Sequence, residues 1–202
     1  QTFLNQLENI DFSEFCLGHA FSHQDFTGGV LGLAYVGTIC NNHGGGTSQN
    51  TGITTTINNG ATSPITQTKL VFAHEIGHNL GCQHATNDIG SWVKGAFTNS
   101  NGMRFNVTVN GQNYPMRTIM AYGAGPRLGY FSNPNINVWG SPTGNTNFAN
   151  NAWTIQQTAP MVGNYLTQII QAKKLTNNAS SQRAVPVNRA TVRWPAGGFN
   201  GN

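Results

Sequence analysis

The stretch HEIGHNLGCQH, from His74 to His84, constrains this chain more than any other part of its sequence. Apolar residues at helical spacing predict a helix over 66–80, which places His74 and His78 one turn apart on the same face. Two imidazoles at that spacing can bind one tetrahedral zinc ion. Gly81 can adopt a left-handed conformation and turn the chain sharply, so that His84 returns to the same metal. Three nitrogen ligands leave a fourth position open to water, which is typical of a catalytic zinc site.

A carboxylate directly follows the first of these ligands. Glu75 stands next to His74 and can therefore reach a water molecule on the same metal. A bare H-E-x-x-H arises by chance fairly often, and the alternative interpretation is a helix with ordinary surface histidines. The added glycine and third histidine make the full pattern much more specific.

The pattern H-E-x-x-H-x-x-G-x-x-H followed by a methionine turn is the signature of the metzincins, and this chain resembles that family. The segment 118–122, with the sequence TIMAY, resembles the Met-turn, in which Met120 would pack as an apolar floor beneath the zinc-binding imidazoles. Met116 is the rival methionine. Three further stretches are similar to the reprolysin or adamalysin branch, especially to its secreted bacterial members: 19–36, 72–84 and 131–164.

The resemblance implies an α+β fold. A metzincin catalytic domain has a twisted mixed sheet in an α/β-like N-terminal subdomain, an active-site helix, and an irregular C-terminal subdomain with the Met-turn and a terminal helix. This domain is expected to span 1–170, and the polar, basic residues 171–202 are expected to form a tail or linker. Metzincins usually place more strands before the edge strand than this chain does, so its first strands are expected to be missing or to lie on a segment that has been cleaved away.

The same resemblance implies a zinc-dependent endopeptidase that hydrolyses peptide bonds of extended polypeptides. Glu75 would assist the attack of a zinc-bound water, and the substrate would pair with an edge strand at Gly32, Leu33 and Ala34. Tyr122 would line the pocket beside the metal or approach the metal itself. Two alternatives stay open: a catalytically silent zinc-containing binding module and a zinc hydrolase of non-peptide amides. The retained glutamate argues against the first, and the edge strand and Met-turn argue against the second.

One position departs from the branch. Reprolysins usually have an aspartate after the third histidine, whereas this chain has Ala85. This difference weakens the assignment to the reprolysin branch but leaves the zinc-binding pattern of the metzincins intact.

Hydrophobic patterning away from the motif predicts short strands and two more helices. Strands are expected at 15–21, 30–36, 52–57, 105–109 and around Tyr114. Helices are expected at 3–15 and 151–170, and Pro160 should kink the second of these or shift its start. The segments 41–50 and 131–144, rich in Gly and Asn, are expected to be loops.

Charged residues make up only 8% of the chain, far below the roughly 25% typical of globular domains. This composition favours a secreted, extracellular protein, and we expect a monomer. The net charge of +4 is uneven, because all 6 acidic residues lie within 1–88. The basic remainder indicates a solvated basic face, a bias towards acidic substrates, or attachment to an anionic surface. No apolar run is long enough to span a membrane, and no motif for nucleic-acid binding is present.

The remaining cysteines and histidines allow further bonds. Of the 3 cysteines, Cys16, Cys40 and Cys82, at least one has no partner within the chain. The pairing stays open; we favour Cys40–Cys82, with Cys16 as a buried small hydrophobic residue.

The histidines outside the motif could form a second metal site. His19, His23 and His43, with Asp25, could hold structural zinc or calcium. We prefer ordinary hydrogen-bonded histidines, so the predicted cofactor is one catalytic Zn²⁺.

Overall fold

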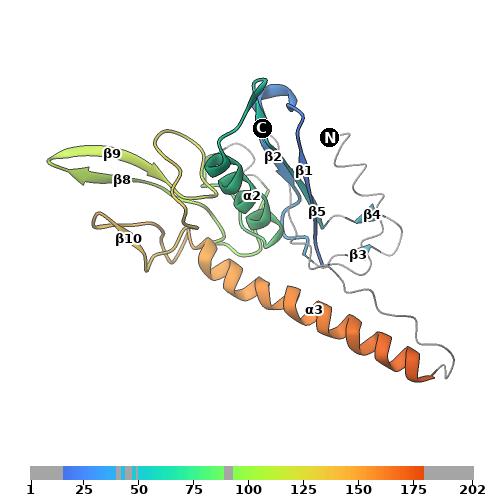
Figure 1. Ribbon diagram of the computed structural model, residues 1–202. Helices are drawn as coiled ribbons and strands as arrows, with labels where there is room; N and C mark the ends of the chain where they lie inside the picture. The colour runs from blue at the N-terminus through green and yellow to red at the C-terminus, as the bar shows by residue number, and fades with distance from the viewer. Residues whose placement is uncertain (1–15, 40–41, 44–46, 49, 89–92, 180–202) are drawn as a thin grey trace.

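The computed structural model describes residues 16–39, 42–43, 47–48, 50–88 and 93–179 (Figure 1). These residues form an α+β fold, as the sequence predicts. Its strands and helices, in chain order, are β1 (Gly18–Ser22), the 3₁₀ helix η1 (Thr27–Gly29), β2 (Gly32–Ala34), β3 (Asn42–His43), β4 (Thr47–Ser48), β5 (Thr51–Thr55), β6 (Ile57–Asn58), β7 (Ala61–Thr62), α2 (Ile65–Asn79), β8 (Arg104–Val109), β9 (Gln112–Arg117), β10 (Asn137–Val138), β11 (Ser141–Pro142) and α3 (Asn151–Ala179).

The mixed three-stranded sheet has β2 at one edge, beside α2. β5 lies in the middle, with β1 parallel to it on one side and β2 antiparallel to it on the other. The β2–β5 register pairs Leu33 with Ile53, and both side chains are buried with Val30. Helix α2 packs across β2 and β5 (Figure 1). The strands predicted at 15–21, 30–36 and 52–57 correspond to β1, β2 and β5.

The hairpin β8–β9 projects away from the sheet and α2 (Figure 1). Its turn is Asn110–Gly111, whose φ angles of 49° and 77° fit the type I′ turn that Asn-Gly favours in a two-residue hairpin loop. The two strands correspond to those predicted at 105–109 and around Tyr114. The predicted loop 131–144 is mostly irregular, but β10 and β11 form a short ladder within it.

Helix α3 is longer than the sequence predicted. It begins at Asn151, as expected, but continues to Ala179 rather than ending near residue 170. The added residues include alanine, lysine and leucine, which are strong helix formers, and neither proline nor glycine. Pro160 lies inside the helix and does not shift its start. Both Pro160 and Gln156, whose carbonyl loses its usual N–H partner, are exposed, so water can bond that carbonyl.

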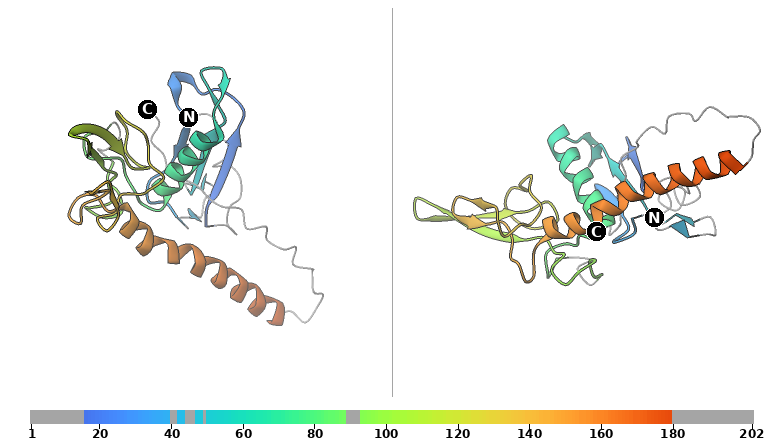
Figure 2. Two further views of the ribbon diagram at one scale, coloured as in Figure 1. Left: turned by 60° about the vertical axis from the view of Figure 1, so that its left-hand side comes forward. Right: turned by 90° about the horizontal axis from the view of Figure 1, so that it is seen from below.

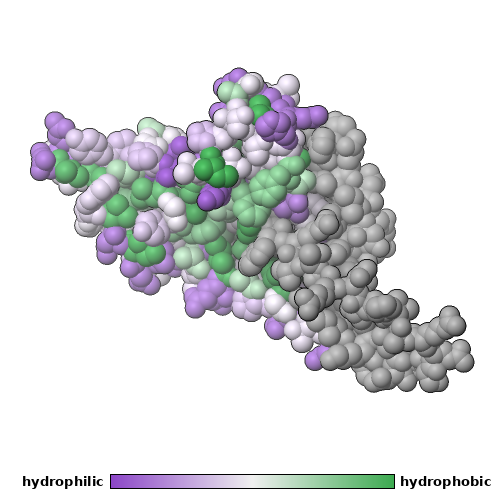
Figure 3. All heavy atoms as spheres, in the orientation of Figure 1, coloured by the Kyte–Doolittle hydropathy of each residue, from purple (hydrophilic) through white to green (hydrophobic). Residues whose placement is uncertain are grey.

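The first half of α3 covers a hydrophobic cluster at the end of α2. Figure 2 shows α3 as one continuous helix that runs along one side of the fold. Three of its residues, Ile155, Val162 and Tyr165, pack with Ile76 against the buried residues Cys16, Leu17, Ile39 and Leu80. On the face seen in Figure 3, hydrophobic residues gather around α2, whereas the tip of the β8–β9 hairpin is hydrophilic.

The cysteines do not pair as expected. Cys16 is disulfide-bonded, whereas Cys82 is a free, fully buried thiol, so the expected Cys40–Cys82 bridge is wrong. The physical reason is the direction of the chain after α2, which turns Cys82 into a hydrophobic cluster with Ile119 and Met120. Cys40 lies outside the described residues.

The helix predicted at 3–15 lies outside the described residues. Within the part of the chain that the structure describes, neither α2 nor α3 combines the length and the apolar character that a membrane span requires.

Candidate metal centre

The end of α2 reverses the chain. The N–H of Cys82 donates to the Gly77 carbonyl at 2.8 Å, and the N–H of Gly81 donates to the His78 carbonyl at 2.8 Å, which is the Schellman pattern. Gly81 has a φ of 87°, in the left-handed region that glycine occupies without a steric cost. The turn leads the chain directly to His84.

Three imidazoles converge beside this turn. The Nε2 atoms of His74, His78 and His84 lie 3.1 Å (74–84), 3.1 Å (74–78) and 2.9 Å (78–84) from one another. All three side chains are buried, and within the described residues they are the group that could hold a metal ion. Tetrahedral ligands at about 2.0–2.1 Å from a zinc ion would be roughly 3.3 Å apart. The donor set and its spacing therefore fit zinc.

Hydrogen bonds to the far side of two rings support this fit. His74 Nδ1 donates to the Ile119 carbonyl at 2.9 Å, and His78 Nδ1 donates to the Cys82 carbonyl at 3.0 Å. Because a carbonyl can only accept, both Nδ1 atoms carry the proton, and each neutral ring presents an Nε2 lone pair to the centre. Burial, and then the neighbouring imidazole, lower the pKa of both histidines well below the ordinary value. Facing lone pairs repel one another, and a cation between them removes that repulsion.

Glu75 lies in a small pocket next to the imidazoles. Its side chain is buried, and its Oε2 has no hydrogen-bond partner among the described residues. Burial raises the pKa of Glu75 well above its ordinary value, and the positive charge of Arg127 opposes that shift. The pocket has a volume of about 180 Å³ and is lined by Gly29, Val30, Leu31, Gly32, Val71, His74, Glu75, Tyr122 and Arg127.

Met120 packs against the back of α2. It is fully buried, and a Cβ placed on Gly77 would lie 2.6 Å from its sulfur and 2.8 Å from the Phe131 ring. The glycine between the two helical histidines therefore allows Met120 to approach the helix closely. The rival methionine, Met116, lies within β9.

We expect Gly77→Ala to lower the free energy of unfolding by about 1–3 kcal/mol, because the added methyl group overlaps Met120 and Phe131. Gly163→Ala is the matched control: Gly163 also lies in a helix but has open space around it, so alanine should stabilise the fold by about 0.5–1 kcal/mol. Urea unfolding of the two variants measures both changes. Equal effects at the two positions would show that Met120 does not pack tightly on α2.

Tyr122 is the predicted pocket residue after the methionine. Its hydroxyl lies 3.4 Å from His74 Nε2, and its ring centroid lies 4.4 Å from that of His84. Burial raises the pKa of the phenol above its ordinary value. The hydroxyl is therefore a neutral hydrogen-bonding group at the metal centre.

The buried carboxylate of Asp88 links the segment after His84 to the segment that carries Tyr122. Asp88 Oδ2 accepts the backbone N–H of Tyr122 at 2.8 Å, and Asp88 Oδ1 lies 3.3 Å from Arg104 Nη1. Ala85, where reprolysins usually have aspartate, is buried. Sequence reasoning missed Asp88; its signal was that Asp88 is the last acidic residue of the chain.

The predicted substrate contacts lie in or next to the pocket. Gly32 forms part of its wall, and a Cβ at this position would collide with the Glu75 carboxylate. Leu33 and Ala34 continue β2 beyond the pocket, and Ala34 has no exposed surface.

The histidines near β1 bind side chains. His19 Nε2 lies 2.9 Å from Thr54 Oγ1, and His23 Nδ1 lies 2.7 Å from Thr56 Oγ1, as expected for hydrogen-bonded histidines. Asp25 accepts the backbone N–H of Gly60. The side chain of His43 is outside the described set.

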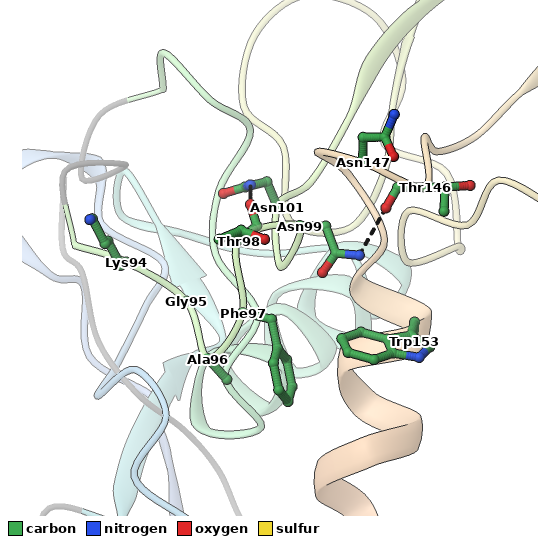
Figure 4. Close-up of a pocket in the computed structure, with 10 residues that line it drawn as sticks. All are labelled: Lys94, Gly95, Ala96, Phe97, Thr98, Asn99, Asn101, Thr146, Asn147 and Trp153. Atoms are coloured by element: carbon green, nitrogen blue, oxygen red, sulfur yellow. Dashed lines mark hydrogen bonds between the residues drawn. The ribbon is translucent and has the colours of Figure 1, made fainter.

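A larger hollow lies away from the metal centre, between residues 94–101 and the start of α3. Its volume is about 810 Å³, and Figure 4 shows its lining of amide and hydroxyl side chains around Phe97 and Trp153. The two rings meet edge to face, with centroids 4.7 Å apart. Its lining contains Lys94 but no histidine, cysteine or carboxylate, so it offers none of the groups that the predicted chemistry requires.

Comparison with known proteins identifies metallopeptidases, in agreement with the candidate metal centre. Residues 1–137 match the family described as Metallo-peptidase family M12B Reprolysin-like. The disintegrin and metalloproteinase domain-containing protein 10 of Homo sapiens is 40% identical over 93 residues, which cover 40% of this chain and 12% of that protein. Its Caenorhabditis elegans homolog is 39% identical over 99 residues, covering 41% and 11%.

A bacterial relative is similar over a comparable length. The peptidyl-Asp metalloendopeptidase of Xanthomonas campestris is 42% identical over 85 residues, which cover 40% of this chain and 18% of that protein. The chain thus spans less than a fifth of the length of each of these relatives.

Proposed function

Because the chain belongs to the reprolysin-like metallopeptidase family M12B, we propose that it is a zinc-dependent endopeptidase that cleaves extended polypeptides. The observation that carries the proposal is the convergence of three buried Nε2 atoms within 3.1 Å of one another. His74, His78 and His84 would hold the ion. Glu75 lies in the pocket that His74 also lines, which supports its assignment as the catalytic base.

The chain's own residues would perform the proton transfers. Bound zinc would supply a Lewis acid and lower the pKa of a water molecule. Glu75 would accept a proton from the attacking water and deliver it to the leaving amine. Tyr122 would line the pocket, and Met120 would serve as the apolar floor of a Met-turn. The buried surroundings of Glu75 strengthen its electrostatic interactions.

The edge strand β2 would bind the substrate backbone. The Thr55 N–H donates to the Leu31 carbonyl at 2.9 Å, so Leu31 and, by alternation, Leu33 turn their backbone groups towards β5. Gly32 and Ala34 then turn theirs away from β5. An extended peptide could add to this edge as a further strand, starting at Gly32 in the pocket wall.

A peptide whose backbone is N-methylated at one position at a time tests this function. The unmodified peptide should be cleaved at an internal bond, because the site is an endopeptidase site. Strand pairing predicts that methylation at every second position lowers kcat/KM about two- to tenfold, since each lost hydrogen bond costs roughly 0.5–1.5 kcal/mol. Failure of the zinc-loaded protein to cleave any unmodified peptide would refute the function, and equal effects at all positions would refute strand pairing.

We also propose that the protein acts outside the cell. The disulfide at Cys16 supports this location, because disulfides persist in oxidising compartments. Recovery of the chain from the culture medium of producing cells, rather than from the cells themselves, is the expected result.

A further inference from the structure

We propose that Arg127 selects the substrate by binding an acidic side chain next to the bond that is cleaved. The inference rests on the proposed function, because it assigns a substrate class to the same site.

The first argument is the position of Arg127. The pocket beside the metal centre has three walls: the segment 29–32 before and within β2, helix α2, and the segment that carries Tyr122 and Arg127. A substrate side chain that enters this pocket therefore lies near the guanidinium group of Arg127. The same pocket contains Glu75, the proposed catalytic base. The volume of about 180 Å³ leaves room for one small side chain.

The second argument is that the Arg127 cation lacks a hydrogen-bonding or ionic partner among the described residues. Its Nε is buried without a hydrogen bond, and among the described residues its guanidinium group makes neither a hydrogen bond nor an ion pair. Burial, and then the charge of Arg117, lower the pKa of Arg127, although an arginine stays protonated in proteins. A half-buried cation that forms no ion pair is costly, and a substrate carboxylate would reduce that cost.

The third argument is that no described carboxylate forms an ion pair with Arg127. Asp25 accepts the Gly60 N–H, and Asp88 is bonded to Tyr122 and Arg104. Glu75 shares the pocket, and its charge favours the Arg127 cation, but the two groups form no ion pair among the described contacts. The anion that complements Arg127 is therefore expected to arrive with the substrate.

The fourth argument is that the side chain is held in place. The backbone on either side of Arg127 is bonded to β9: Arg117 N–H donates to the Pro126 carbonyl at 3.2 Å, and Leu128 N–H donates to the Arg117 carbonyl at 2.8 Å. The guanidinium carbon lies 5.8 Å from the centroid of the Tyr122 ring, within the range of a cation–π contact. A fixed, planar guanidinium group can bind both oxygens of one carboxylate.

Peptide pairs that differ only in one residue flanking the cleaved bond, Asp against Asn and Glu against Gln, test the proposal. The wild-type protein should cleave the acidic member with a kcat/KM at least about tenfold higher, because a site built for a hydrogen-bonded group rejects the analogue that lacks it. Arg127→Met should lose this preference by slowing the acidic peptide alone. Lys69→Met removes the same charge from an exposed position on α2 and should keep the preference. Arg127→Glu should instead favour Lys over Gln.

A binding measurement separates this proposal from the proposed function. In the Glu75→Gln background, the acidic peptide should bind uncut at least about tenfold more tightly than its amide partner, and Arg127→Met should abolish the difference. A folded Arg127→Met protein, checked by its melting temperature, that still prefers the acidic peptide in binding or cleavage would overturn the proposal. Cleavage by the wild type without any acidic preference would also overturn it, while leaving the endopeptidase function intact.

Discussion

Replacing Glu75 by glutamine is expected to lower kcat/KM on a peptide substrate by about 10²- to 10⁴-fold, the range that a positioned general base contributes. The amide has nearly the same shape as the carboxylate but cannot accept the proton of the attacking water. Because Oε2 of Glu75 has no hydrogen-bond partner among the described residues, the substitution breaks no bond there. The three imidazoles should therefore keep their positions and their zinc.

The measurement combines kcat/KM with the zinc content and melting temperature of the same sample. Lys69→Gln, at an exposed position on the same helix, is the control and should retain the wild-type rate. A Glu75→Gln protein that contains zinc and keeps more than about a tenth of the wild-type rate would contradict the assignment of Glu75 as the base.

Replacing His78, one of the three proposed ligands, by alanine is expected to reduce zinc binding severely. Even residues that only orient a metal ligand contribute about 10- to 100-fold to metal affinity, so the loss of a ligand should weaken binding more than about 100-fold. Peptide cleavage should fall to the background with it. His23→Ala is the control, because the His23 side chain is exposed and bonded to Thr56.

Metal analysis after gel filtration gives the zinc content of each variant. We expect about one equivalent in the wild type and in His23→Ala, and a small fraction of that in His78→Ala. Full retention of zinc by a double variant with His74→Ala and His78→Ala would place the metal elsewhere in the chain.

The active-site helix was predictable because its determinants are local. The apolar period set its limits at 66–80, within one residue of the observed Ile65–Asn79. The glycine that ends it was visible in the sequence, and the Schellman turn at Gly81 depends only on neighbouring residues. For the same reason the spacing of the motif anticipated that His84 returns to His74 and His78.

The parts that escaped prediction depend on contacts between distant segments. Nothing near Cys82 in the sequence indicates that its thiol is covered by Ile119 and Met120, 37 or more residues away (119 − 82 = 37). Arg127 joins the pocket only because the segment after Met120 folds back beside β9. The last turns of α3, residues 171–179, were missed for a different reason. Helix propensity extends them without the apolar stripe on which the prediction relied.

The most direct measurement is a zinc titration of metal-free protein with binding and peptide cleavage recorded together. We expect the cleavage rate to rise in proportion to bound zinc and to reach its maximum at about one equivalent per chain, with the Glu75→Gln protein following the same binding curve without activity. A folded chain that binds one equivalent of zinc through these histidines and cleaves no unfolded polypeptide would contradict the proposed endopeptidase, as would cleavage that persists at full rate without metal.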